Sequence, residues 1–219
     1  MVLKDEEAFP LLFGTIMKLI SILCLLISFS AYSKNFVPAS FSSKYEESLT
    51  SATGKIKKSH GKIDYKFPGH LRFEVLDPVK SLFVVNPKKA WFYQPAFMKG
   101  EKDQVTIQKS ANLPLVKFLD SVKDGIENSK LFKTRYEKND LILTFVKTIQ
   151  KEMGIEEVTL RASKSAKEIN DISGFETITL KHVNKNKTNI RLIDLKENVK
   201  FPSGHFIFKP SANTKVIKN

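Results

Sequence analysis

Residues 61–95 read GKIDYKFPGHLRFEVLDPVKSLFVVNPKKAWFYQP. In the first half of this stretch, apolar and charged side chains alternate on both sides of Pro68-Gly69, which is typical of two β-strands joined by a turn. Because strand side chains alternate between the two faces, a three-residue turn at 68–70 would place six apolar side chains on one face. They are Ile63, Tyr65, Phe67, Leu71, Phe73 and Val75. The stretch therefore predicts a sheet with one dry face and one wet face.

Similar strand patterns continue to the end of the chain. We expect strands near residues 39–50, 55–67, 71–76, 79–85, 89–95, 102–108, 131–137, 140–147, 155–162, 171–182, 188–195 and 204–208. An antiparallel sheet of so many short strands is too large to stay flat and should curl into a barrel or half-barrel. The sequence therefore predicts a mainly β protein.

One helix is expected between Asn112 and Gly125. Pro114 suits the first turn of a helix, and glycine suits its end. Apolar residues recur at three- and four-residue steps, at Leu115, Phe118, Leu119, Val122 and Ile126. This apolar stripe either packs permanently on the sheet or covers the open mouth of a barrel as a lid, and the pattern alone leaves both alternatives open.

Residues 17–33 predict a secretory signal peptide. Met17-Lys18 gives a charged start, residues 19–28 form a short apolar run, and Ala31-Tyr32-Ser33 is a small-x-small cleavage site. The apolar run is shorter than the roughly 20 residues that a transmembrane helix needs. We therefore expect cleavage near Ser33 and export of the remaining chain.

The acidic residues at 5–7 do not suit the basic start of a signal peptide, so we expect residues 1–16 to be a wrongly assigned upstream extension. Met17 is then the expected start of the protein. The single cysteine, Cys24, lies in the apolar run and would be removed with it. The mature chain, residues 34–219, should fold as one domain without a disulfide or a thiolate.

The formal net charge of +13 favours anionic partners, such as acidic lipid headgroups or an acidic protein face. The lysines of the chain occur in small groups separated by acidic residues, and export would remove the protein from most nucleic acid. The positive charge therefore does not indicate a nucleic-acid partner. The four histidines have no metal-ligand spacing, and no G-x-S-x-G, P-loop or dinucleotide turn occurs. Glu46 and Glu47 should point to opposite faces of a strand, which is poor geometry for a cooperating acid and base. The sequence predicts no enzyme, no metal and no cofactor.

Several short motifs follow one another in the order of a known family. They are Phe41-x-x-x-Tyr45-x-Glu47, Gly61-Lys62-Ile63, Pro68-Gly69, Leu71-Arg72-Phe73, Asp77-Pro78, Trp91-Phe92-Tyr93-Gln94-Pro95 and Phe206-Ile207-Phe208-Lys209-Pro210. With this order the chain resembles the outer-membrane lipoprotein carrier proteins, the LolA-type periplasmic chaperones. The resemblance covers most of the chain after residue 38. It implies an antiparallel, unclosed half-barrel with a helical lid.

The resemblance also implies a function: a monomeric periplasmic chaperone that carries the acyl chains of lipoproteins from the inner to the outer membrane. An inner-membrane ATP-driven transporter would load it, and an outer-membrane lipoprotein receptor would unload it. The cavity would be lined by Tyr65, Phe67, Leu71, Phe73, Trp91 and Tyr93, and the lid would present Leu115, Phe118, Leu119 and Val122. Two alternatives remain open, a periplasmic lipid- or lipopolysaccharide-binding module and an outer-membrane lipoprotein receptor of similar fold.

The residue before Pro68 departs from the family pattern. Members commonly have an arginine there that hydrogen-bonds to the lid, whereas this chain has Phe67. We therefore expect lid closure to depend on apolar contact instead of directed hydrogen bonds.

Overall fold

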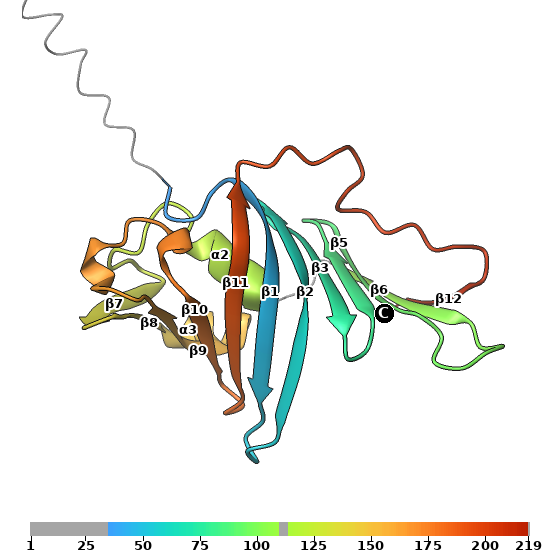
Figure 1. The fold of residues 1–219 in the computed structure, drawn as a ribbon, viewed down its shortest axis with the longest axis horizontal. Coiled ribbons are helices and arrows are strands. Elements are labelled where there is room, and N and C mark those ends of the chain that lie inside the picture. The colour runs from blue at the N-terminus through green and yellow to red at the C-terminus, as the bar shows by residue number, and fades with distance from the viewer. Residues whose placement is uncertain (1–34, 110–113, 219) are drawn as a thin grey trace, which may run out of the picture. The chain divides into compact units, whose positions relative to one another are not determined.

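A computed structural model describes residues 35–109 and 114–218, and a single curved sheet organises them (Figure 1). Twelve strands form this sheet, in the order β12-β6-β5-β4-β3-β2-β1-β11-β10-β9-β8-β7. Within the described residues β7 does not pair with β12, so the sheet stays open. The expected mainly β fold with an unclosed sheet is thus confirmed. The expected upstream extension, signal peptide and cleavage site lie outside the described residues.

The strands are β1 (Ser40–Thr50), β2 (Ile56–Lys66), β3 (His70–Asp77), β4 (Ser81–Val85), β5 (Lys89–Gln94), β6 (Asp103–Lys109), β7 (Phe132–Glu137), β8 (Asp140–Phe145), β9 (Ile155–Arg161), β10 (Thr177–His182), β11 (Lys187–Glu197) and β12 (Thr214–Lys218). The α-helices are α2 (Pro114–Ser121) and α3 (Lys147–Met153), and two 3-10 turns are η1 (Ala166–Glu168) and η2 (Ile172–Gly174). No helix in the described part of the chain is long and apolar enough to cross a membrane.

The β2–β3 hairpin has the apolar face that its sequence predicts. Tyr65 pairs with Leu71, and Ile63 pairs with Phe73, so all four side chains share one face. The turn itself differs from the expectation, because Lys66 pairs with His70 and the loop is therefore 67–69. Phe67 consequently lies in the turn and not in the strand.

The two faces of the sheet carry separate hydrophobic clusters. The face that packs against α2, called here the inner face, contributes Phe41, Tyr45, Ile63 and Tyr65 to the main core, with many side chains from β8 to β11. The opposite, outer face carries a smaller cluster at the β12 side of the sheet. Its members are Val84, Trp91, Val105 and Phe206, with Leu82, Tyr93, Ile107, Phe201 and Phe208 packed against them.

The C-terminal segment corrects one expected strand. Residues 204–208 form no strand, since the Ile207 N–H donates to the Gly204 carbonyl in a turn between Pro202 and Pro210. Phe206 and Phe208 instead cover the outer face. The chain then continues to β12, which pairs with β6 in parallel and was not expected from the sequence.

Two further boundaries differ because helical turns replace the ends of expected strands. The strand expected at 140–147 ends at Phe145 and is followed by α3, which closes with Gly154 in the left-handed region. The strand expected at 171–182 begins only at Thr177, after η2. The Asp171 side chain accepts a hydrogen bond from the Ser173 N–H and so favours the turn over an extended strand.

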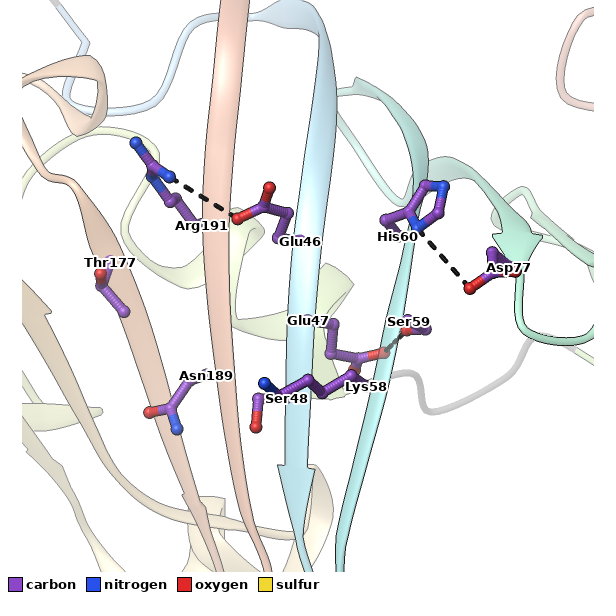
Figure 2. A pocket seen from close by; sticks show the side chains of 10 residues that line it. All are labelled: Glu46, Glu47, Ser48, Lys58, Ser59, His60, Asp77, Thr177, Asn189 and Arg191. Atoms are coloured by element: carbon purple, nitrogen blue, oxygen red, sulfur yellow. Dashed lines mark hydrogen bonds and ion pairs between the residues drawn. The ribbon is translucent and has the colours of Figure 1, made fainter.

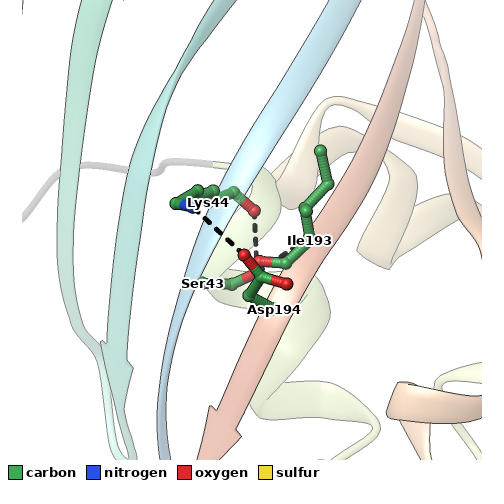
Figure 3. Close-up of polar contacts among 4 residues, drawn as sticks. All are labelled: Ser43, Lys44, Ile193 and Asp194. Carbon is green, nitrogen blue, oxygen red and sulfur yellow. Dashed lines mark hydrogen bonds and ion pairs between the residues drawn. The ribbon is translucent and has the colours of Figure 1, made fainter.

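A β-bulge interrupts the pairing of β1 with β11 near the centre of the sheet, because Asp194 and Leu195 of β11 together oppose Ser43 of β1 (Figure 3). The Ser43 hydroxyl is buried there and contacts both the carbonyl oxygen and the N–H of Ile193, at 2.8 and 3.1 Å. Lys44 of β1 forms an exposed ion pair at 3.1 Å with Asp194 of the bulge. The serine therefore satisfies backbone groups of β11 at the point where the strand pairing is irregular.

Candidate functional site

An apolar cavity of about 280 Å³ lies between α2 and the inner face of the sheet. It draws its walls from both halves of the sheet and from the first turn of the helix. The lining residues are Glu47, Leu71, Phe73, Val75, Phe83, Pro114, Leu115, Leu180, His182, Thr188 and Ile190. Aliphatic and aromatic side chains dominate, so the cavity suits an apolar ligand.

A row of aromatic rings crosses the inner face beside this cavity. Tyr45 stacks on Phe73 at 4.1 Å between ring centroids, although β2 runs between their strands. Gly61 in β2 makes this contact possible because it has no side chain beneath the Tyr45 ring. The row continues through Phe83 to Phe92, which stack at 4.2 Å. A second apolar hollow of about 180 Å³ adjoins Phe83 and Phe92, so apolar surface extends toward β6.

The helix α2 contributes to both the cavity and the core. Leu115 is only partly buried and lines the cavity. Phe118, Leu119 and Val122 are almost completely buried in the main core, and Val122 lies in the turn after the helix. The four residues expected to form a lid thus divide into one that faces the cavity and three that anchor the helix.

Of the six residues expected to line the cavity, only some lie at it. Leu71 and Phe73 line it, and Tyr65 is buried nearby on the inner face. Phe67 lies in the β2–β3 turn, 37% exposed, with the Lys123 ammonium 4.9 Å from its ring centroid.

Trp91 and Tyr93 lie on the outer face, away from the cavity. Phe83 pairs with Phe92 across β4 and β5, so the alternation that turns Phe92 inward turns its two neighbours outward. There Tyr93 packs on Phe208 at 4.9 Å and donates a hydrogen bond to Asp103 at 2.8 Å. These two residues are part of the outer cluster and not of the cavity wall.

Directed hydrogen bonds tie α2 to the sheet, contrary to the expectation of apolar contact alone. The Tyr65 hydroxyl donates to Asp120 at 2.7 Å, and the Gly69 N–H donates to the same carboxylate at 3.0 Å. Burial, followed by the hydrogen bond to Asp120, strongly raises the pKa of the Tyr65 hydroxyl, so it remains a donor. Asp120 gave no sequence signal because its partners are 55 and 51 residues away.

Replacing Tyr65 by phenylalanine should loosen α2. The variant keeps the buried ring but removes a hydrogen bond to a charged acceptor, which contributes about 1.5–3 kcal/mol. We expect a loss of that order in the free energy of unfolding, together with faster amide hydrogen exchange in α2. Tyr136→Phe is the matched control, because Tyr136 is exposed on β7. Equal changes in both variants would contradict a role of the Tyr65 hydroxyl in holding α2 to the sheet.

Polar groups occupy the part of the cavity formed by β1, β10 and β11. The half-buried Glu47 accepts a hydrogen bond from Ser59 at 2.8 Å, and His182 Nε2 lies 2.9 Å from the Thr188 hydroxyl. Burial lowers the pKa of His182, so its ring is neutral at neutral pH. The buried Tyr45 hydroxyl has no hydrogen-bond partner among the described residues. Burial, and then the charge of Glu47, raise the pKa of this hydroxyl.

A larger hollow of about 520 Å³ lies on the outer face, and its charged groups are mostly paired with one another (Figure 2). Glu46 extends toward Arg191 at 3.6 Å, and His60 lies 4.0 Å from Asp77. Glu47 also lines this hollow, although strand alternation directs it and Glu46 to opposite faces. Exposed ion pairs of this kind contribute little to stability. The smaller, apolar cavity is the better candidate for a binding site.

Within residues 35–109 and 114–218, no group of three or more His, Cys, Asp or Glu side chains is placed to hold a metal ion. An open curved sheet with an apolar cavity beneath a helix defines the class of half-barrel, carrier-like folds.

The comparisons assign the chain to one family within this class. The family model of the outer membrane lipoprotein carrier protein LolA matches residues 38–209, and the chain belongs to this family. An outer-membrane lipoprotein carrier protein of Legionella pneumophila is 22% identical over 92% of this chain and 98% of its own length. A carrier of Xanthomonas campestris is 29% identical over 36% of this chain and 38% of its own. A LolA superfamily structure from Nitrosomonas europaea aligns with a TM-score of 0.45 and 11% identity, covering 78% of this chain and 91% of that one.

Proposed function

We propose that this protein is a periplasmic chaperone that holds the acyl chains of lipoproteins and carries them from the inner to the outer membrane. The observation that carries the proposal is the apolar cavity between α2 and the inner face, in a chain of the lipoprotein carrier family. Loading by an inner-membrane ATP-driven transporter and delivery to an outer-membrane receptor complete the proposed route. The protein would act as a monomer, without a cofactor.

The energetics of acyl chains explain why such a carrier is needed. At about 0.8 kcal/mol per buried methylene, two or three long chains represent on the order of tens of kcal/mol of exposure in water. Unassisted passage through an aqueous compartment would therefore be negligible. A carrier must bind these chains tightly enough to keep them soluble but less favourably than the receiving site, so that delivery runs downhill.

Leu115→Asp is expected to separate binding from folding. Its side chain lies at the cavity and is only partly buried, so an aspartate there should leave the fold intact while placing a carboxylate where acyl chains would pack. We expect affinity for a fluorescent acylated peptide to fall at least about tenfold, since each 1.4 kcal/mol of lost binding energy is a factor of ten. Circular dichroism should remain that of a β protein.

Lys117→Gln is the matched control for this binding experiment. Lys117 is two residues further along α2, and its ammonium donates to the Glu152 carbonyl at 2.7 Å, away from the cavity. Its substitution should leave affinity for the acylated peptide unchanged. Unaltered binding by Leu115→Asp would rule out this cavity as the acyl site.

A lipid- or lipopolysaccharide-binding module is the second candidate, and the same cavity favours it because its apolar wall would contact the acyl chains of either kind of ligand. Native mass spectrometry of the protein purified from its own periplasm distinguishes the two by the mass of the bound molecule. A lipoprotein mass supports the carrier, whereas a phospholipid or lipopolysaccharide mass supports the module.

A further inference from the structure

Glu47 is the only carboxylate among the described residues that line the mainly apolar cavity, and no ion pair with a described basic side chain holds it. In the described part of the chain its polar contact is the hydrogen bond from Ser59, which is neutral. Lys58 and Arg191 line the hollow on the outer face together with Glu47, but Arg191 pairs with Glu46 and no ion pair joins Lys58 to Glu47. His182, on the same cavity, is held neutral by burial.

Filling the cavity with acyl chains would remove water from this carboxylate. An ion that loses its hydration without gaining a partner is strongly destabilised. A ligand that fills the cavity is therefore disfavoured by Glu47 unless it brings a compensating positive charge. The half-buried position of the side chain suits a group at the border between an acyl chain and solvent.

Two further polar groups lie close to the same place. Thr188 is 6% exposed and lines the cavity, and its hydroxyl oxygen is an additional acceptor. The Tyr45 hydroxyl is buried close to Ser59 and within the electrostatic range of Glu47. A primary ammonium, with three N–H donors, matches the Glu47 carboxylate and the Thr188 hydroxyl oxygen, whereas an anionic headgroup without a cation of its own would be repelled.

We propose that the cavity recognises amphiphiles with a primary ammonium next to their acyl chains, and that Glu47 is the residue that selects them. The inference rests on the proposed function and narrows its cargo. The fitting chemistry is an acylated cysteine whose α-amino group is free, or a phospholipid with an ethanolamine headgroup. An N-acylated cysteine lacks this charge and would leave Glu47 unpaired.

The test compares two fluorescent peptides that differ in a single group. Both carry S-dipalmitoylglyceryl-cysteine at the amino terminus, one with a free amine and the other N-acetylated. The natural protein should bind the free amine about tenfold more tightly, because hydrogen bonds between ionised groups are roughly twice as strong as neutral ones. Glu47→Gln, which keeps the acceptor for Ser59, should reduce this preference to within about twofold.

Glu46→Gln is the control, because Glu46 is the preceding residue on β1 and is paired with Arg191 (Figure 2). It should keep the preference of the natural protein. A second pair of ligands, lysophosphatidylethanolamine and lysophosphatidylglycerol, identifies the source of the ammonium by competition. Discrimination between these lysolipids without discrimination between the peptides assigns the site to the phospholipid headgroup.

The outcomes separate this inference from the proposed function. Equal affinity within both ligand pairs overturns the ammonium site while leaving an acyl carrier intact. The ammonium site is also overturned if Glu46→Gln loses the preference as Glu47→Gln does, because the effect would then come from the net charge of the protein and not from Glu47. Failure to bind any acylated ligand overturns the proposed function itself.

Discussion

Phe118→Asp is expected to abolish the folded state. Phe118 is fully buried in the main core, on the side of α2 that packs against the sheet. Truncating a buried phenylalanine alone costs about 3–5 kcal/mol, and an unpaired buried carboxylate adds to this cost. The sum approaches the total stability of a typical domain, about 5–15 kcal/mol. Circular dichroism of the variant should show loss of β structure and no cooperative thermal transition.

Leu115→Asp provides the comparison on the same helix, because the same aspartate is then placed at the cavity and not in the core. The contrast between the two variants tests how α2 is held. A folded Phe118→Asp variant that has merely lost acyl binding would mean that α2 moves away from the sheet as a free lid. The packing of Phe118 and Leu119 would then describe only one of two states.

Gly61→Ala should destabilise the protein by about 3 kcal/mol or more, although replacing glycine by alanine in a compatible backbone usually stabilises. A methyl group at this position would lie 1.7 Å from the Glu74 carbonyl oxygen and 3.0 Å from the Tyr45 ring. The first contact is with backbone, so a change of rotamer cannot relieve it. The β2–β3 pairing and the stack of Tyr45 on Phe73 should both be disturbed. Chemical denaturation measures the loss of unfolding free energy.

Lys62→Ala is the control for this substitution, since Lys62 is the next residue of β2 and is exposed on the outer face. Its effect should stay within about 0.5 kcal/mol, as is usual for surface positions. If Gly61→Ala proves equally mild, β2 and β3 can separate without cost, and the aromatic row would not be part of the fixed framework.

Alternation of side chains predicted the strands and the dry face of the hairpin from the sequence, because Ile63, Tyr65, Leu71 and Phe73 carry a strong period-two signal. The same reasoning could not say which face of β5 meets the cavity. Trp91, Phe92 and Tyr93 are consecutive and all aromatic, so their pattern is compatible with either orientation. The register with β4 decides it, and this is a tertiary property.

The parts of the site that the sequence could not reveal depend on partners distant along the chain. Asp120 meets Tyr65 and Gly69 only after the helix has docked. From the sequence, Glu47 could be considered only together with Glu46, as an unsuitable acid–base pair. Its position beside the cavity becomes apparent only when β10 and β11 supply the opposite wall. The pairing of β12 with β6 likewise follows a long irregular segment without local pattern.

A sheet that remains open has two free margins, and both can template the addition of strands from other molecules. Here the margins are β7, with Lys133 and Arg135, and the five-residue β12, with Lys215 and Lys218. Short length and repeated positive charge discourage a second copy from extending either margin by backbone pairing. The basic character of the chain thus also protects against aggregation, in a fold that cannot hide its margins by closing on itself.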